Sequence, residues 1–414
     1  MKLSDLSGRK IGICVSGGLD SKTVSKRLMD EGLDIICFTA DLAQPDEDDI
    51  NNIPKKMAPC GVKTIIVDLK DEMAQGCFDV IKANAQYDGG YWNTTGLARA
   101  ITVKGLVAAM KLEGCNVLSH GATGRGNDQM RFERYTAVID PDMDVFAPWR
   151  DETLLKQFPG RTEMANYLSQ FNIPAVIGMK KKYSTDANLA GLSHEAEDLE
   201  SLETPCTIVN PTMGVWPMDA PDKIEKITLR FEKGYCVAID ERKMPPLAVM
   251  SEANNRAGRN GIGMKNALEN RIIGTKSRGV YEAPGMELLG YGVQQIYQAV
   301  FDRRSLTIYK LMSQFISDQI YDGRYFDPST CAARAAIDCL AEKAMGTITI
   351  DMYKGNLHFN KLTDCPASIY NEADSSMEAP KEASNGFNPA SAQGYADILK
   401  VEAVALAKAG QIQK

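Results

Sequence analysis

Short apolar runs alternate with amphipathic stretches over about the first 174 residues of the chain. The apolar runs predict strands, which we place at 10–15, 34–41, 63–68, 116–120 and 144–148. The stretches between them predict helices: one that ends at Gly32, and others that begin at 45–49, span 96–112, open near 127 and lie near 162–171. This alternation is typical of an α/β fold with a parallel sheet covered on both faces. Because ligands bind such sheets at the carboxyl ends of the strands, near a switch in strand order, we expect Ser16, Ala40 and Gly121 to line one crevice.

The pattern changes after about residue 174 and predicts a second, α+β part. Residues 180–209 predict a loop-rich stretch. Beyond it we predict hairpins at 224–239 and 347–362, and helices at 248–257, 291–300, 305–322 and 329–345. Residues 371–388 are polar and predict an extended arm. Residues 389–409 predict a final helix, with Asn388 as its cap, Pro389 in its first position and Gly410 at its end. Its apolar side chains must pack either on their own subunit or on a neighbour.

Composition narrows the class of protein. The 414 residues are 44% hydrophobic and 24% charged, which is typical of a globular chain with more than one domain. The net charge of −7 argues against a nucleic-acid partner. Ten cysteines without a Cys-x-x-Cys pair indicate reduced thiols, and three scattered histidines indicate no metal site. We find neither a secretory signal nor an apolar run long enough to span a bilayer, so we expect a cytoplasmic protein without a membrane partner.

The first candidate for chemistry is the hexapeptide Ser-Gly-Gly-Leu-Asp-Ser at 16–21, between the first strand and its helix. This geometry directs several backbone N–H groups to one point, where the helix N-terminus adds partial positive charge. Gly17 and Gly18 let a polyanion approach the main chain closely. The stretch is therefore either a phosphate-binding loop or an ordinary strand-to-helix turn. It is not of the Walker type, because no Gly-Lys-Ser/Thr follows.

A second glycine-rich stretch, 120–131, follows a strand and opens a helix. Asn127, Asp128 and Arg131 fall within one turn of that helix. Asp128 suits the ammonium group of a free amino acid, and the planar guanidinium of Arg131 suits its carboxylate. The alternative is a surface ion pair of little consequence.

Two further polar stretches are less specific. Residues 183–195 form a predicted loop with hydroxyls and carboxylates in quick succession, which capping and turn roles explain equally well. The charges of residues 269–282 suit either a binding site or a solvated face.

These four stretches resemble sequences of known protein families. The first is similar to the pyrophosphate loop of ATP pyrophosphatases, which split ATP between its α and β phosphates. His-Gly-Ala-Thr-Gly-Arg-Gly-Asn-Asp-Gln at 120–129 and Lys-Ser-Arg-Gly-Val-Tyr-Glu-Ala-Pro-Gly at 276–285 resemble the argininosuccinate synthase family specifically. The order of all four stretches agrees over nearly the whole chain, most strongly from 10 to 310. The sequence Asn-Thr-Thr at 93–95 resembles the sequences of a bacterial branch of that family at this place.

The resemblance implies a reaction and an architecture. ATP, with Mg²⁺, adenylates the ureido oxygen of citrulline and releases pyrophosphate, and the amine of aspartate then displaces AMP to give argininosuccinate. Residues 1–173 would form the nucleotide-binding domain of the pyrophosphate-loop ATPase type. Residues 174–370 would form the synthetase domain, and residues 371–414 an arm and an oligomerisation helix of a homotetramer.

The resemblance also implies roles for single residues, and it identifies neither a general base nor a resident metal. ATP would contact Cys14, Val15, Ser16, Gly17, Gly18, Leu19, Asp20, Ser21, Lys22, Ala40, Gly121, Asp128 and Asp186. Aspartate would contact Thr123, Asn127 and Asp128. Citrulline would contact Tyr91, Asn127, Arg131, Ser184, Ser193, Glu195, Glu269 and Tyr281.

Two positions depart from the family pattern. Lys22 stands where the family has a small hydroxyl residue, and it either adds a cation beside the phosphates or points to solvent. Gly96 stands where many members have Ser or Pro, and in members with Ser that hydroxyl contacts citrulline, so we expect one polar contact fewer. Two alternatives stay open: a paralogue that ligates a different urea-like acid or amine, and a nucleotide-binding protein without turnover.

Overall fold

A computed structural model describes residues 1–47, 49–124, 126–174, 183–375 and 390–413. The chain divides into two compact units, Met1–Ala367 and Ser368–Lys414. Parts of the features predicted above lie outside the described residues: position 48 of the stretch 45–49, position 125 of the stretch 120–131, the start of the 180–209 stretch, most of the arm at 371–388, and the pair Asn388 and Pro389.

The first unit begins with a five-stranded sheet in the order β3-β2-β1-β4-β5, and all of its pairings are parallel. Its strands confirm the five predicted ones: β1 Lys10–Cys14, β2 Asp34–Asp41, β3 Thr64–Asp68, β4 Val117–Ser119 and β5 Asp144–Phe146. The chain adds β2 and β3 on one side of β1, and β4 and β5 on the other. The strand order therefore switches between β1 and β4, which places the candidate ligand crevice at their carboxyl ends.

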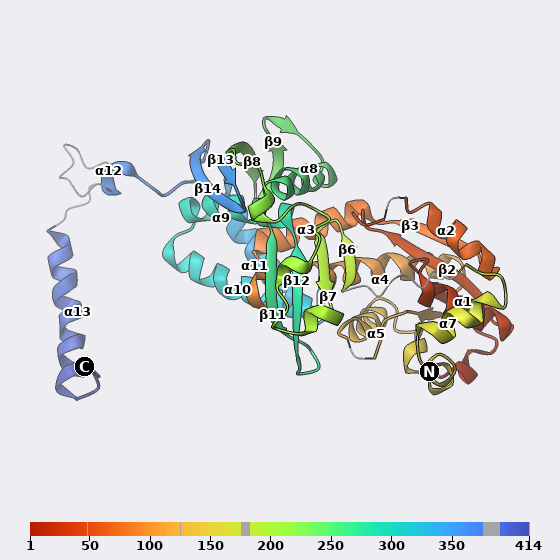
Figure 1. Cartoon of the computed structure of the whole chain (residues 1–414). Helices are drawn as coiled ribbons and strands as arrows, with labels where there is room; N and C mark the ends of the chain where they lie inside the picture. The colour runs from red at the N-terminus through yellow and green to blue at the C-terminus, as the bar shows by residue number, and fades with distance from the viewer. Residues whose placement is uncertain (48, 125, 175–182, 376–389, 414) are drawn as a thin grey trace. The chain divides into compact units, whose positions relative to one another are not determined.

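Helices alternate with these strands along the chain, and several of them pack on the sheet (Figure 1). They are α1 Leu19–Asp30, α2 Asn52–Met57, α3 Lys70–Ala83, α4 Thr94–Leu112, α5 Asp128–Ile139, α6 Glu152–Gln157 and α7 Arg161–Ser169. The α4 helix contacts β2 on one side and β6 and β7 on the other, so it joins the parallel sheet to the rest of the unit. Short 3-10 helices lie at Leu3–Leu6, Ala58–Cys60, Asp88–Gly90, Pro148–Arg150, Glu197–Glu200, Cys206–Ile208 and Pro217–Asp219.

One predicted helix start is wrong. Residues 45–47 and 49 lie outside any helix, because α2 begins only at Asn52. The Asp49 carboxylate accepts the backbone N–H of Asn51 at 2.9 Å and so forms a turn before the helix. Short acidic side chains compete with the helix for backbone N–H groups, which explains the later start.

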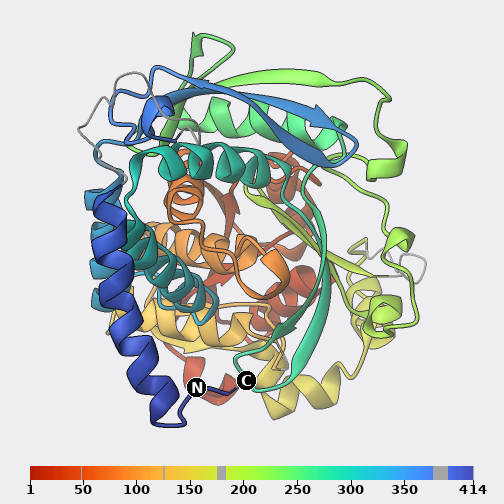
Figure 2. The same cartoon turned by 90° about the vertical axis from the view of Figure 1, so that its left-hand side faces the viewer.

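Two antiparallel sheets follow along the chain. One has the order β11-β12-β7-β6, and the other has the order β10-β9-β8-β13-β14. The strands are β6 Ser184–Asn188, β7 Gly191–Glu195, β8 Glu225–Glu232, β9 Tyr235–Ile239, β10 Arg242–Lys243, β11 Met264–Asn270, β12 Lys276–Glu282, β13 Met345–Tyr353 and β14 Asn356–Thr363. The helices are α8 Pro246–Arg259, α9 Pro284–Val300, α10 Arg303–Tyr321 and α11 Pro328–Ala341. The helix α9 packs on β13 and β14 (Figure 2).

Three predictions for this part need correction. The helix predicted at 291–300 begins seven residues earlier, at Pro284. Residues 184–195 are not a loop but the β6–β7 hairpin. Its strands are rich in small and polar residues, so the sequence lacks the apolar alternation that marks a strand. The helix predicted to end at 345 ends at Ala341, and Met345 instead opens β13. The undecided stretch 269–282 lies in the β11–β12 hairpin.

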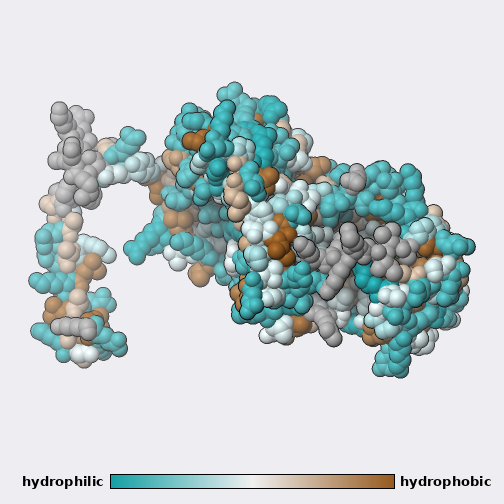
Figure 3. Space-filling view, viewed as in Figure 1, coloured by the Kyte–Doolittle hydropathy of each residue, from teal (hydrophilic) through white to brown (hydrophobic). Residues whose placement is uncertain are grey.

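The second unit contains α12 Glu372–Ser375 and α13 Ser391–Lys408. Gly410 follows α13 with φ +70°, which agrees with its predicted role at the helix end. Apolar side chains are interspersed along this helix (Figure 3), and Ile398 and Val401 are 68% and 72% exposed. Among the described residues, no helix is both long and apolar enough to cross a membrane.

Candidate active site

A cavity of about 690 Å³ lies at the switch in strand order. Ser16, Ala40 and Gly121, at the ends of β1, β2 and β4, all line it, as the strand pattern predicts. Side chains from α4, α5, the β6–β7 hairpin, β11 and the end of α10 complete its wall. The cavity therefore joins the parallel sheet to the antiparallel part of the same compact unit.

The loop between β1 and α1 forms one end of this cavity. The Val15 N–H donates to the Phe38 carbonyl at 2.9 Å, and the Ser16 N–H donates to Ser21 Oγ at 3.0 Å. Gly17 has φ +74°, a conformation that residues with a Cβ rarely adopt. Gly18 is the N-cap of α1 and provides no side chain to its free N–H groups. The first turn of α1 thus keeps N–H groups for an anionic ligand.

Some residues predicted at this loop do not line the cavity. Gly17, Gly18, Leu19 and Lys22 are absent from its wall, although Cys14, Val15, Ser16, Asp20 and Ser21 belong to it. The Nζ of Lys22 donates to the carbonyl of Pro174 at 2.9 Å.

An ion network lines the cavity. Arg99, from α4, donates through Nε to Asp128 Oδ2 at 2.8 Å and through Nη2 to Asp186 Oδ2 at 2.6 Å. Arg131 donates through Nη1 to the other oxygen of Asp128 at 3.0 Å. The Arg131 side chain is only 4% exposed, so its pair with Asp128 is not the surface ion pair of the alternative interpretation.

Burial and charge act in opposite directions on the two carboxylates of this network. Burial alone would raise the pKa of Asp128, but Arg99 and Arg131 outweigh it and hold that pKa below its ordinary value. For Asp186, burial is the largest influence and raises the pKa, because Arg99 offsets only part of it and Asp128 repels. Arg99 is thus the cation that both acids share.

Four tyrosines surround a buried carboxylate, Glu269. Tyr91 stacks on Tyr281 with ring centroids 4.1 Å apart, and Tyr87 stacks on Tyr321 at 3.8 Å. The Tyr281 hydroxyl donates to Glu269. Burial raises the pKa of Glu269, and the hydrogen bonds from Tyr281 and Tyr321 oppose this rise. Tyr91 and Glu269 line the cavity, whereas Tyr281 lies behind Glu269 and does not.

The β6–β7 hairpin adds hydroxyls and a carboxylate. Ser184 pairs with Glu195 across the hairpin, and both residues line the cavity together with Ser193. Burial raises the pKa of Glu195, and the charges of nearby acids, Glu269 above all, raise it further, to about 7. His194, between Ser193 and Glu195, is directed to Glu282 instead, with Nε2 at 2.7 Å from Oε1. This alternation is that of an ordinary strand, in which successive side chains point to opposite faces.

The structure brings most of the remaining predicted residues to the same wall: Thr123, Asn127, Asp128, Arg131 and Asp186 all line the cavity. Sequence reasoning did not single out Arg99 or Tyr321, which also line it. For Arg99 one signal existed, a lone charge within an otherwise apolar segment of a helix. Within the described ranges, no three His, Cys, Asp or Glu side chains are placed to hold a metal ion.

Gly96 is the second position that departs from the family pattern, and its surroundings are not those expected of a residue that contacts citrulline. It does not line the cavity. A Cβ at this position would lie 2.9 Å from the carbonyl oxygen of Ile320, so the residue faces α10 rather than a ligand.

A parallel sheet with an open helix N-terminus at its switch point, beside a cavity lined by charged side chains, is the arrangement of an ATP-using synthetase of the HUP-domain class. Comparison with protein families agrees. Residues 10–174 match the arginosuccinate synthase N-terminal HUP domain, and residues 183–405 match the arginosuccinate synthase C-terminal domain. The chain belongs to the argininosuccinate synthase family. It is therefore an AMP-forming ligase, of a family that joins citrulline and aspartate at the expense of ATP in arginine biosynthesis.

Proposed function

We propose that this enzyme converts citrulline, aspartate and ATP into argininosuccinate, AMP and pyrophosphate through a citrullyl-AMP intermediate. The observation that carries the proposal is a single cavity with two different ends. One end is the β1–α1 loop, which suits phosphates, and the other is a set of buried acids and arginines, which suits amino acids. A reaction between an adenylated ureido group and an amine needs both ends in one enclosure.

At the nucleotide end, the segment 14–22 holds the phosphates, and Ala40 and Gly121 meet the adenosine through their backbones. Support comes from the open first turn of α1 and from the places of Ala40 and Gly121 in the cavity wall. Gly17, Gly18, Leu19 and Lys22, outside the wall, act through the shape of the loop. Asp186, whose carboxylate Arg99 holds, lies near the nucleotide.

Mg²⁺ enters this site with the nucleotide. Magnesium binds through phosphate oxygens and one or two carboxylates. Asp20, in the first turn of α1, lines the cavity, and burial raises its pKa, a shift that a nearby cation would oppose. The residues of the loop therefore fit such a cation. When bound, it would neutralise charge on the departing pyrophosphate.

At the amino-acid end, Asp128 takes the ammonium group of aspartate, with Thr123 and Asn127 beside it. Both oxygens of Asp128 already accept from arginines, so an entering ammonium must share the carboxylate with them. The citrulline residues are Tyr91, Asn127, Arg131, Ser184, Ser193, Glu195, Glu269 and Tyr281. All of these except Tyr281 line the cavity, and Tyr281 acts through its hydrogen bond to Glu269.

The chemistry follows from this placement. The ureido oxygen is a poor nucleophile, so alignment with the α-phosphorus supplies much of the rate. The backbone N–H groups at the start of α1 stabilise the charge that develops on pyrophosphate. The amine of aspartate then forms the new C–N bond, and the C–O bond to AMP breaks. The proton of that amine passes to a substrate or pyrophosphate oxygen.

The test follows the ureido oxygen. Citrulline labelled with ¹⁸O in its ureido group is mixed with enzyme, ATP and aspartate, and AMP is analysed by mass spectrometry. The label is expected in the phosphate of AMP, and pyrophosphate is expected only when citrulline is present. Unlabelled AMP, or ADP with orthophosphate, would overturn the mechanism. Pyrophosphate release with another urea-like acid, but not with citrulline, would identify a paralogous ligase instead.

Three organisational proposals accompany this function. The nucleotide-binding domain spans 1–173, the synthetase domain 174–370 and the arm with its helix 371–414. The enzyme acts in the cytoplasm. It assembles as a homotetramer, for which the exposed apolar side chains of α13 are the support.

A further inference from the structure

The last turn of α10 lies unusually close to the start of α4. At Gly96, a Cβ would lie 2.9 Å from the carbonyl oxygen and 3.3 Å from Cγ2 of Ile320. Real Cβ atoms do not approach a backbone oxygen so closely, so any side chain at Gly96 must push the α10 backbone away. Asn93 holds the same contact from the α4 side, because its Nδ2 donates to the carbonyl of Ser317 at 3.1 Å.

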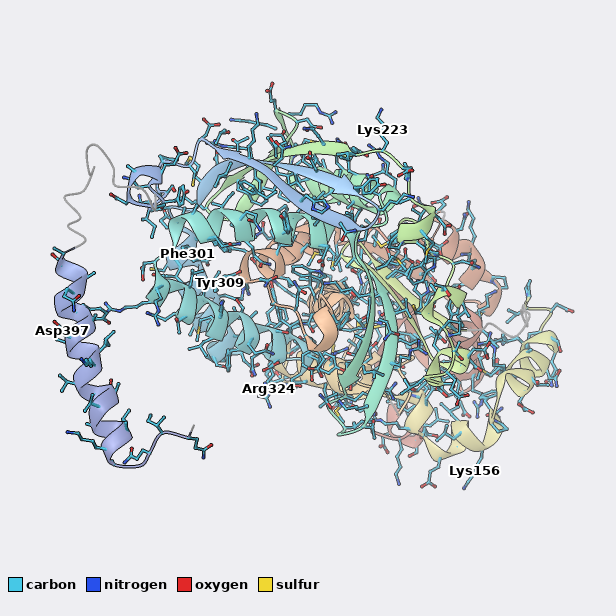
Figure 4. All side chains as sticks on the ribbon, turned by 60° about the vertical axis from the view of Figure 1, so that its left-hand side comes forward. Lys156, Lys223, Phe301, Tyr309, Arg324 and Asp397 are labelled. Atoms are coloured by element: carbon cyan, nitrogen blue, oxygen red, sulfur yellow. The ribbon has the colours of Figure 1, made fainter. Side chains whose placement is uncertain are left out.

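Tyr321, the last residue of α10, directly follows this contact. Figure 4 labels Tyr309 in the same helix and Arg324 just after it, so the turn that carries Tyr321 can be located. The residue is 1% exposed and lines the cavity. Its ring stacks on Tyr87 with centroids 3.8 Å apart, which fixes the direction of its hydroxyl.

Three proposed substrate-binding residues depend on Tyr321. Its hydroxyl accepts from Asn127 Nδ2 at 2.9 Å and lies near the Glu269 carboxylate, and burial together with the charge of that carboxylate raises the pKa of Tyr321. Its carbonyl oxygen accepts from Arg131 through Nε at 3.0 Å and Nη2 at 2.8 Å. These three residues come from the start of α5 and from β11, elements that are far apart in the chain. One residue at the end of α10 therefore sets the orientation of groups from both halves of the unit.

We propose that Tyr321 is a positioning residue for the amino-acid end of the cavity, and that Gly96 is required to place it there. The proposal rests on the proposed function, since Asn127, Arg131 and Glu269 are taken to hold the substrates. The proposal also differs from the expectation that glycine at position 96 merely removes a hydroxyl contact to citrulline. A serine at this position would strike the end of α10 rather than add a bond to citrulline.

The first test is Tyr321→Phe, which removes the hydroxyl and keeps both the ring and the backbone carbonyl. Loss of the hydrogen bond with Asn127 and of the interaction with the Glu269 carboxylate is expected to raise the KM for citrulline roughly ten- to a hundred-fold. The KM for ATP should change by less than about two-fold, because Tyr321 contacts no residue of the β1–α1 loop. A purely structural role would instead change activity without this selectivity for one substrate.

Tyr325→Phe is the matched control. Tyr325 is also a buried tyrosine, but its hydroxyl donates to Asp79 at 2.7 Å and it does not line the cavity. The KM for citrulline should stay within about two-fold of the wild-type value in this variant. An unchanged citrulline KM in Tyr321→Phe, or equal changes in both tyrosine variants, would overturn the proposal.

The second test uses Gly96→Ser and Gly96→Ala, and it does not depend on the folding of the tyrosine variant. Both substitutions are expected to raise the KM for citrulline, because the Cβ alone displaces the end of α10. If Gly96→Ser lowers that KM, the hydroxyl restores a contact and the proposal fails. Wild-type enzyme that forms no argininosuccinate would refute the proposed function, whereas active wild type with unaffected variants would refute only this inference.

Discussion

Arg99→Gln removes the cation that, within the described part of the chain, Asp128 and Asp186 share. These acids come from α5 and β6, so the network links the parallel sheet to the antiparallel part of the unit. The side chains are 18%, 26% and 34% exposed for Arg99, Asp128 and Asp186. Breaking a fully buried pair costs about 3–5 kcal/mol, and an exposed pair contributes about 0–1 kcal/mol. For this intermediate burial we expect a loss of about 2 kcal/mol of unfolding free energy, or roughly 2 °C in Tm for a chain of this length.

The pH dependence gives the sharper test of this reasoning. Without Arg99, burial and the repulsion from Asp128 raise the pKa of Asp186 further above its ordinary value, and the pKa of Asp128 also rises, although Arg131 still opposes that rise. An acid whose pKa is higher in the folded state loses its contribution to stability as pH rises from its unfolded pKa through its folded pKa. The deficit of the variant relative to wild type should therefore be small near pH 4 to 5 and larger at pH 8.

Differential scanning calorimetry of both proteins at pH 5 and pH 8 measures this difference. Lys63→Gln serves as control, because it removes an ion pair with Glu113 in which the lysine side chain is 58% exposed. That variant should lose less than about 1 kcal/mol at either pH. An equal deficit of Arg99→Gln at pH 5 and pH 8, or a larger one at pH 5, would refute the assignment of Arg99 as the shared counter-ion.

Three further predictions concern the loop, the hairpin and the final helix. Gly17→Ala introduces a Cβ at a residue with φ +74°, and that Cβ would lie 3.2 Å from Lys56 Cδ. The KM for ATP in pyrophosphate-release assays should therefore rise roughly ten-fold. An unchanged KM would contradict the loop geometry. Burial, followed by the charge of Glu269, raises the pKa of Glu195 to about 7. The pH profile of kcat/KM for citrulline should therefore show an inflection between pH 6 and pH 8, and Glu195→Gln should lose it. Because its pKa is raised in the folded state, Glu195 stabilises the wild-type protein less and less as pH rises through 7. The Tm of Glu195→Gln relative to wild type should therefore be higher at pH 8 than at pH 6. Removal of the chain from Ser391 onward should lower the mass measured by light scattering, and an unchanged mass would show that α13 does not hold the oligomer together.

The β6–β7 hairpin shows where reasoning from the sequence stops. Its residues are small and polar, and they pair through backbone bonds with each other and with β12. Several of their side chains, among them Ser184, Asp186, Ser193 and Glu195, line the cavity rather than an apolar core, so no alternation of apolar residues marks them as strands. The polar character that identified this stretch as a candidate site is the same property that concealed its secondary structure.

Local features of the chain determined the parallel sheet, the loop at residues 16–21 and the crevice at Ser16, Ala40 and Gly121. Periodicity and turn chemistry act between near neighbours, and the ends of parallel strands meet at one edge whatever the distant residues do. The tertiary structure alone decided the roles of Arg99 and Tyr321. Arg99 meets Asp186 across 87 positions of the chain, and Arg131 meets Tyr321 across 190. Such contacts depend on how separate elements pack, and no local pattern of hydrophobic and polar residues records that packing.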